Sequence, residues 1–165
     1  MTSGPAPGPE EWRRALQRFV DAIPHTRALG LQAGAAGPEG VLLRLPWQDD
    51  LLGDEGRGLV HGGLLTMLLD TACGAAVLPA LPELEVCPTL DLRLDHFRPG
   101  VAGADLHVEA RAVAVTASVV FTEGRVWQTP DEPLARGIAN FARLGPRNTP
   151  PAFAAALFAE ENDHG

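Results

Sequence analysis

The chain has 165 residues, of which 45% are hydrophobic and 21% are charged. These values fit one globular domain and exclude a wholly disordered chain, a collagen and a coiled coil. The net charge is −8, so we expect no nucleic-acid partner, because a phosphate backbone needs a basic surface. Two cysteines make no disulfide framework, and no CxxC or HExxH pattern indicates a metal site.

Two segments, the N-terminal arm and the longest apolar stretch, are candidates for a signal peptide or a membrane span, and neither is predicted to form one. The Gly/Pro-rich arm at 1–9 lacks the cationic start and the apolar core of a signal peptide. The longest apolar stretch, 64–81, contains Asp70, Gly74 and Pro79, and is too short and too polar for a membrane span. We therefore expect a soluble, cytoplasmic protein that binds no membrane.

The first third of the chain predicts one helix and a hairpin. Residues 10–22 carry apolar side chains three and four positions apart, which predicts an amphipathic helix that ends before Pro24. Alternating apolar residues predict paired strands at 29–33 and 41–45. The polar stretch 47–58, rich in Gly and Asp, predicts a loop.

Residues 59–78 are apolar nearly all round, which predicts a helix buried on most sides. The next segment, 89–96, alternates strictly, with leucines on one face and charged residues on the other. This pattern is typical of a strand with one solvent-exposed face. Further alternation predicts strands at 104–115, 117–128 and 133–144.

The element order predicts an α+β fold, in which one curved antiparallel sheet wraps around a single long central helix. We expect one domain over 10–148. A C-terminal tail over 149–165 follows, with a short helix at 152–158.

The segment most suggestive of chemistry is the start of the buried helix, His61-Gly62-Gly63, followed by Asp70 in its middle. The first N–H groups of a helix lack intrahelical partners and carry the positive end of its dipole. Glycines let a ligand approach these groups closely, which suits a carbonyl oxygen that becomes an oxyanion. A carboxylate in apolar surroundings is costly unless it is paired or functional.

Structural interpretations of the same residues remain open. The two glycines could serve close packing against a sheet, and His61 could be a simple helix cap. Asp70 could face a water-filled gap or pair with an arginine across an interface. Cys73 fits a small buried hydrophobic side chain.

Spacing adds a prediction about assembly. Asp70 follows Gly62 by eight positions, which is about 12 Å along a helix axis. A base and an oxyanion donor must both reach one carbonyl, at roughly 3 Å. If the motif is catalytic, two antiparallel copies must therefore meet, with Gly62 of one facing Asp70 of the other.

The run His61-Gly62-Gly63, six further residues, then Asp70-Thr71-Ala72 resembles the central helix of the hotdog-fold acyl-CoA thioesterases, in particular their phenylacetate-degradation (PaaI-like) branch. The stretch from Thr89 to Pro99, TLDLRLDHFRP, is similar to the next strand of that family. The resemblance covers about 27–144. It implies the hotdog fold, homodimers that often form homotetramers, and hydrolysis of acyl-CoA without a further cofactor.

The resemblance also implies roles for single residues. Asp70 would activate the attacking water or attack the thioester directly. The Gly62 N–H, at the helix start with Gly63, would polarise the carbonyl, and His61 would help to shape that site. Thr89 matches a position where some relatives place a hydroxyl near the water.

Two departures from the family pattern affect substrate binding. Glu55 stands where many relatives carry Asn or Gln, and 116–118 reads Thr-Ala-Ser where relatives often have Gly-Arg-Ser. Arg98 could instead meet the CoA phosphates, although Arg93 and Arg143 are equally arguable and a solvated face is the simpler interpretation. Small and apolar side chains could border the acyl group, among them Leu65 and Cys73.

Two other functions remain as alternatives. The departures are compatible with a non-catalytic protein that binds or senses an acyl-CoA. A hydratase or dehydratase would need a histidine a few residues after Asp70, and the next one is His96.

Overall fold

A computed structural model of the chain describes residues 6–159, so most of the predicted arm and the end of the tail, 160–165, lie outside the described residues. One antiparallel sheet of six strands runs in the order β1-β2-β6-β7-β8-β5. Its strands are β1 (Gln32–Gly37), β2 (Gly40–Leu45), β5 (Thr89–His96), β6 (Leu106–Val115), β7 (Val119–Thr129) and β8 (Glu132–Ala142).

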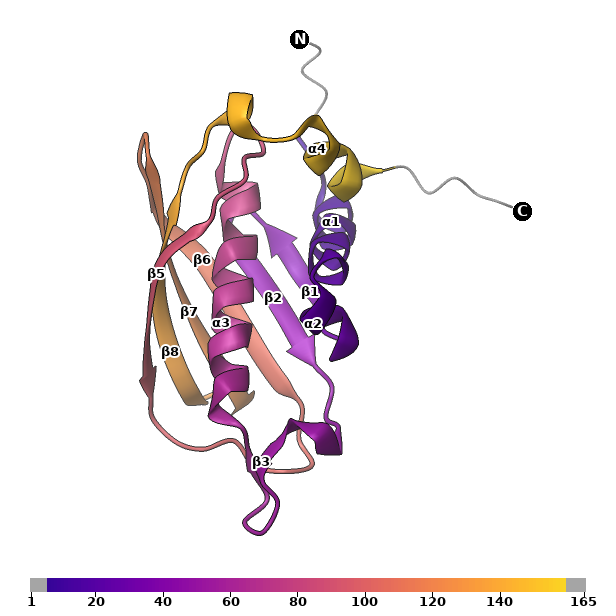
Figure 1. Ribbon diagram of the computed structural model, residues 1–165, viewed down its shortest axis with the longest axis vertical. Helices are drawn as coiled ribbons and strands as arrows, with labels where there is room; N and C mark the ends of the chain where they lie inside the picture. Colours follow the sequence, from indigo (N-terminus) through magenta and orange to yellow (C-terminus); the bar gives the residue numbers. More distant parts are fainter. Residues whose placement is uncertain (1–5, 160–165) are drawn as a thin grey trace, which may run out of the picture.

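The helices gather on one face of this sheet (Figure 1). The long helix α3 (Gly62–Val77) packs on strands from β2 to β5, and α1 (Pro9–Ala22) lies beside it over β1. The short helix α2 (Pro24–Ala28) follows α1, and the C-terminal α4 (Pro151–Phe158) packs on α1. The predicted α+β architecture, a curved antiparallel sheet around one central helix, is confirmed.

The sheet approaches α3 closely because two strands carry glycine where they cross it. A Cβ at Gly124 would lie 3.1 Å from the Leu69 side chain, and one at Gly137 would lie 3.3 Å from it. Leu69 is fully buried, as are Leu68 and Ala72 on the same helix. This packing fixes the position of α3. It thereby also positions the start of the helix at Gly62 and the carboxylate of Asp70, which the sequence singles out.

The segment before α3 differs from the prediction. The stretch predicted as a loop contains a short 3₁₀ turn, Asp49–Leu51, and strand β3 (Leu52–Asp54), which pairs with β4 (Leu59–Val60). The central helix therefore begins at Gly62 rather than at 59. The first strand also begins later than predicted, at Gln32, because α2 and a turn at Gly30, with φ +70°, occupy the residues before it.

Strand β5 has the predicted bounds but not a strict alternation. Thr89 pairs with Phe141 and Asp91 with Asn140, so Leu90 is an extra residue that forms a bulge. Phe141 points into the core, and its partner Thr89 therefore also faces the helix side. The bulge leaves Leu90 58% exposed at the free edge of the sheet.

The central helix with its following turn, Gly62–Ala80, has 19 residues and a mean hydropathy of 1.5, enough by length and composition to cross a membrane. The prediction that this stretch is too short and too polar is therefore wrong. Its packing identifies it instead, since Leu68, Leu69 and Ala72 are buried against the sheet. The helix is the core helix of a soluble fold.

Candidate active site

His61 caps α3 and lies between two glycines. Its Nδ1 accepts a hydrogen bond from the Gly63 N–H at 3.0 Å, while the backbone N–H of His61 donates to the Leu51 carbonyl. A Cβ at Gly63 would lie 2.8 Å from the imidazole ring, and one at Gly53 would lie 2.7 Å from the His61 Cα. Both glycines are therefore needed for the observed position of His61.

Gly62 occupies the first position of α3 and faces open space. Apart from its two chain neighbours and the adjacent helix backbone, no protein atom lies within 4 Å of the place where its Cβ would stand. Its N–H has no intrahelical acceptor, because it belongs to the first turn. Since the His61 ring occupies the Gly63 N–H, the Gly62 N–H is the donor available to a ligand at the positive end of the helix dipole.

A cavity of about 490 Å³ opens beside this helix start. His61, Gly62 and Leu65 form one side of it, and the end of β5 with the following Phe97 and Arg98 forms another. Arg98 is exposed and lies 3.3 Å from Glu132 in an ion pair. The cavity thus combines an N–H donor, apolar walls and a cationic side chain.

Asp70 lies two turns further along α3 and is half-buried. The Thr89 hydroxyl donates a hydrogen bond to Asp70 Oδ1 at 3.0 Å. The side chain of Asp70 is therefore held toward the strand bulge by a hydrogen bond to one oxygen, and its second oxygen remains available as an acceptor. Asp70 does not line the cavity at Gly62, which agrees with a separation of about 12 Å along the helix.

The connection that leads into Thr89 is anchored by a buried ion pair. Glu85 is fully buried and accepts hydrogen bonds from Arg143 Nη2 at 2.5 Å and from the Gly145 N–H at 3.0 Å. The hydrogen bond from Arg143 is the main cause that lowers the pKa of Glu85 below 4.5, against the opposing effect of burial. The Pro88 carbonyl then accepts from the Ala142 N–H, so the residues before Thr89 are held at both ends.

The remaining predicted residues fall in different places. Leu65 and Arg98 line the cavity, whereas Glu55 lies in the exposed turn between β3 and β4 and is not a lining residue. Cys73 is fully buried in the core, where desolvation raises its pKa to about 11. Its thiol is therefore neutral near pH 7. Cys73 is also not among the residues that line this cavity.

Sequence reasoning missed Gly53 and Glu85. Gly53 lies in a stretch whose Gly and Asp content is typical of loops, and nothing local shows that its Cα approaches His61. Glu85 lies between prolines, and its partner Arg143 is far away in sequence. Within residues 6–159, no group of three His, Cys, Asp or Glu side chains could hold a metal ion.

Comparison with known proteins relates this geometry to one family. The family described as thioesterase superfamily matches residues 57–135, which include α3 and most of the sheet. A protein of Halobacterium salinarum named as an esterase is 35% identical over 111 residues, 66% of this chain and 72% of its own length.

Two further proteins extend the likeness. A medium/long-chain acyl-CoA thioesterase of Escherichia coli, YigI, is 24% identical over 140 residues, 66% of this chain and 90% of its own. The structure of a mutant of the phenylacetic acid degradation protein PaaI of Thermus thermophilus superposes with a TM-score of 0.64 and 27% identity, over 73% of this chain and 99% of its own. The predicted hotdog fold and the resemblance to PaaI-like proteins are confirmed.

Proposed function

The chain belongs to the thioesterase superfamily, and from this membership we propose that it hydrolyses acyl-CoA thioesters to a free acid and CoA. The family supports thioester hydrolysis in general, and the named activity of the Escherichia coli relative supports the acyl-CoA class. The observation that carries the proposal is the hydrogen bond from Thr89 to Asp70, on the same helix whose first residue, Gly62, has open space at its Cβ position.

The N-terminal end of α3 binds the thioester carbonyl in this proposal. The carbonyl oxygen takes the open position beside Gly62 and accepts its N–H, where the helix dipole stabilises the developing negative charge. His61 supports this geometry indirectly, because its ring engages Gly63 and keeps the first turn in place. Leu65 borders the thioester, and Arg98 lies where it can reach a CoA phosphate.

Asp70 supplies the base. Thr89 fixes one carboxylate oxygen, and the other accepts a proton from water as the water oxygen adds to the carbonyl carbon. The tetrahedral intermediate then collapses and the C–S bond breaks. The departing CoA thiolate takes the proton from Asp70, which returns the carboxylate to its starting state. Thiolate is a competent leaving group, so the proposed reaction needs no metal and no further cofactor.

A second copy of the chain completes the site, since Asp70 and Gly62 of one helix cannot meet at one carbonyl. The surface of α3 supports such a pairing. Thr66 is exposed and Met67 and Asp70 are half-buried, which leaves an uncovered stripe along an otherwise apolar helix. Leu90 adds an exposed apolar side chain at the adjacent sheet edge. We infer a homodimer that brings two α3 helices together in antiparallel orientation.

Release of CoA thiol from short, medium, long and aromatic acyl-CoA substrates tests the proposal. The wild-type protein is expected to turn over at least one of them, and Asp70→Asn to lose that activity while it still binds the substrate. Asp21→Asn, on the exposed surface of α1, is the matched control and should keep full activity. A blank without substrate corrects for reaction of the half-buried Cys87 with the thiol reagent.

Two outcomes would contradict the proposal. A folded dimer that binds acyl-CoA but turns over none of the substrates would favour the non-catalytic binding protein. Unchanged turnover in Asp70→Asn would remove the carboxylate from the mechanism.

A further inference from the structure

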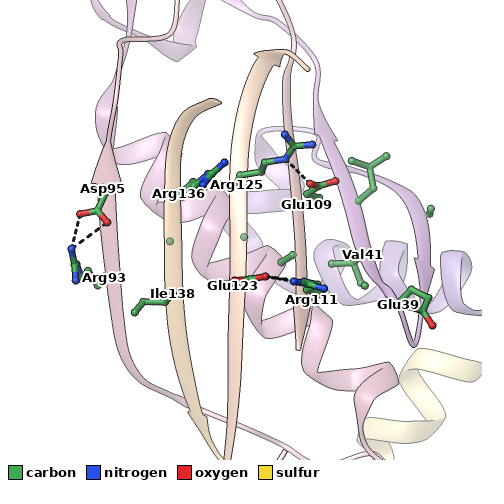
Figure 2. Close-up of a pocket in the computed structure, with 16 residues that line it drawn as sticks. Glu39, Val41, Arg93, Asp95, Glu109, Arg111, Glu123, Arg125, Arg136 and Ile138 are labelled. Carbon is green, nitrogen blue, oxygen red and sulfur yellow. Dashed lines mark hydrogen bonds and ion pairs between the residues drawn. The ribbon is translucent and has the colours of Figure 1, made fainter. Parts of the chain in front are cut away.

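The ion pair between Glu85 and Arg143 is the most deeply buried one within residues 6–159. Glu85 is 2% exposed, whereas the carboxylate of every other ion pair in this range keeps 30% or more of its side chain exposed. Figure 2 shows two of the exposed pairs, Arg111 with Glu123 and Arg125 with Glu109. Exposed pairs contribute little to stability, while a buried carboxylate is costly unless it is well paired. The reaction proposed above assigns no role to this buried group.

Glu85 lies in the connection between α3 and β5, where residues 84–88 have no regular secondary structure. Because these residues form no strand ladder, other contacts must fix their position. The Glu85 carboxylate binds them to the segment 142–149, which follows β8. The Thr149 hydroxyl of the same segment accepts a hydrogen bond from the Val86 N–H at 2.9 Å. The connection is therefore held at successive residues by one neighbouring segment.

Arg143 is itself fixed to the sheet, which makes it a rigid anchor for Glu85. Its Nη1 donates to the Thr116 carbonyl at 2.7 Å, and its backbone N–H donates to the Ser118 carbonyl at 2.8 Å. Both carbonyls belong to the turn between β6 and β7. One arginine thus joins this turn, the end of β8 and the connection that carries Glu85.

Thr89 depends on this connection more than a residue inside a strand would. It is the first residue of β5, at the free edge of the sheet, and it pairs with Phe141. The bulge at Leu90 interrupts the ladder directly after it. The strand therefore holds Thr89 through one residue pair. The preceding connection, which spans about 13 Å from Glu85 when extended, helps to determine where its hydroxyl lies.

From these contacts we propose that Glu85 is a positioning residue for the thioester hydrolysis proposed above: its ion pair keeps the Thr89 hydroxyl within hydrogen-bonding distance of Asp70. Glu85 does not line the cavity at Gly62, and the inference rests on the proposed function of Asp70. The hydrogen bond from Thr89 is 3.0 Å long, so a displacement of about 1 Å breaks it. The Asp70 carboxylate then loses its fixed orientation, and kcat falls.

The alternative is that the ion pair serves stability alone. Variants that weaken it would then unfold more easily, while the folded protein would react at the wild-type rate. A positioning role predicts instead that kcat falls in fully folded protein. Because Gly62 and Arg98, which are proposed to bind the substrate, lie in the cavity away from Asp70, the positioning role also predicts an unchanged KM.

Glu85→Gln tests the positioning role in the full-length protein. The glutamine has nearly the same shape and can still accept the Gly145 N–H, but it lacks the charge that binds Arg143. We expect kcat for thiol release to fall about tenfold, with KM within about twofold of the wild-type value, well below the melting temperature of the variant. Hydrogen exchange followed by mass spectrometry should show faster exchange at residues 86–89.

A double-mutant cycle with Thr89→Val shows whether Glu85 acts through Thr89. Without the hydroxyl nothing remains for Glu85 to position, so the double variant should lose about tenfold in kcat, as each single variant does. Independent effects would multiply to about 100-fold. Thr149→Val loosens the same connection at Val86 and leaves the ion pair intact. It takes the place of Glu85→Gln in the cycle if the latter does not fold.

Asp105→Asn is the matched control. Asp105 also anchors a connection through an arginine and a backbone N–H, since it accepts from Arg44 Nε at 2.8 Å and from the Trp47 N–H at 2.7 Å. That connection follows β2 and does not lead to Thr89. The control should therefore melt at a lower temperature than the wild type and keep its kcat.

Three results would overturn the inference. They are a wild-type kcat in folded Glu85→Gln, a double variant whose loss is the product of the two single losses, and an equal loss of kcat in Asp105→Asn. Wild-type protein that releases no thiol from any substrate would instead refute the proposed function, and with it the need to position Asp70. The two failures are thus distinguished by the activity of the wild type.

Discussion

The two adjacent glycines at the start of α3 are expected to respond in opposite ways to the same substitution. In Gly62→Ala the new methyl group meets no protein atom within 4 Å other than those of its chain neighbours and the adjacent helix backbone, whereas in Gly63→Ala it would stand 2.8 Å from the His61 ring. The ring must then swing away, and the 3.0 Å hydrogen bond that caps the helix is lost. Both variants carry the same Gly-to-Ala change in helix propensity, so this term cancels when they are compared.

The free energy of unfolding is therefore expected to be lower for Gly63→Ala than for Gly62→Ala by the contribution of the helix cap, about 1 kcal/mol. For a chain of this size, this corresponds to a melting temperature roughly 2–4 °C lower for Gly63→Ala than for Gly62→Ala. Activity should follow the opposite order. The methyl group added at position 62 enters the open space in which the thioester is proposed to bind and crowds its carbonyl oxygen away from the N–H. We therefore expect kcat/KM to fall about 100-fold, as on loss of an oxyanion donor.

Differential scanning calorimetry and thiol release on the same preparations check both parts. Full turnover by Gly62→Ala would show that no substrate atom comes close to this position. Equal melting temperatures would show that the contact between His61 and Gly63 contributes nothing to stability.

Three further outcomes follow from the contacts around Asp70 and in the core. Thr89→Val should lower kcat about tenfold by removing the hydroxyl that orients Asp70, whereas Thr89→Ser should retain most of it; equal loss in both would refute the orienting role. The lowered pKa of Glu85 means that its ion pair with Arg143 stabilises the fold fully above pH 4.5 and less as pH falls through the lower folded-state value. Glu85→Gln should therefore cost about 3 kcal/mol at pH 7 and less in acid, in urea unfolding at several pH values; a pH-independent cost would contradict this. Cys73, buried and with its pKa raised to about 11, should be alkylated by iodoacetamide at pH 8 only after unfolding, as peptide mass spectrometry can show.

The order and type of the main elements could be predicted because their patterns are local. The central helix is apolar all round, and the strands alternate, so each element carries its own signal. The position of Thr89 could not be predicted in this way. Strict alternation would place Thr89 on the solvent-exposed face with Asp91. Only the pairing of β5 with β8 reveals the bulge that turns Thr89 toward Asp70.

The surroundings of His61 show a similar limit. The motif indicated a helix start with accessible N–H groups, and the structure has one. That Gly53 lies against His61 depends on the short β3–β4 pairing, which has too few residues to produce a periodic pattern.

The central claim is that one catalytic site takes Gly62 from one copy and Asp70 from another. A mixed dimer of Gly62→Ala and Asp70→Asn chains, co-expressed with two different tags and purified through both, tests it most directly. Each variant alone should be inactive, whereas the mixed dimer contains one intact site and should recover about half of the wild-type activity. A mixed dimer as inactive as its parents would place both groups in the same chain and contradict the account.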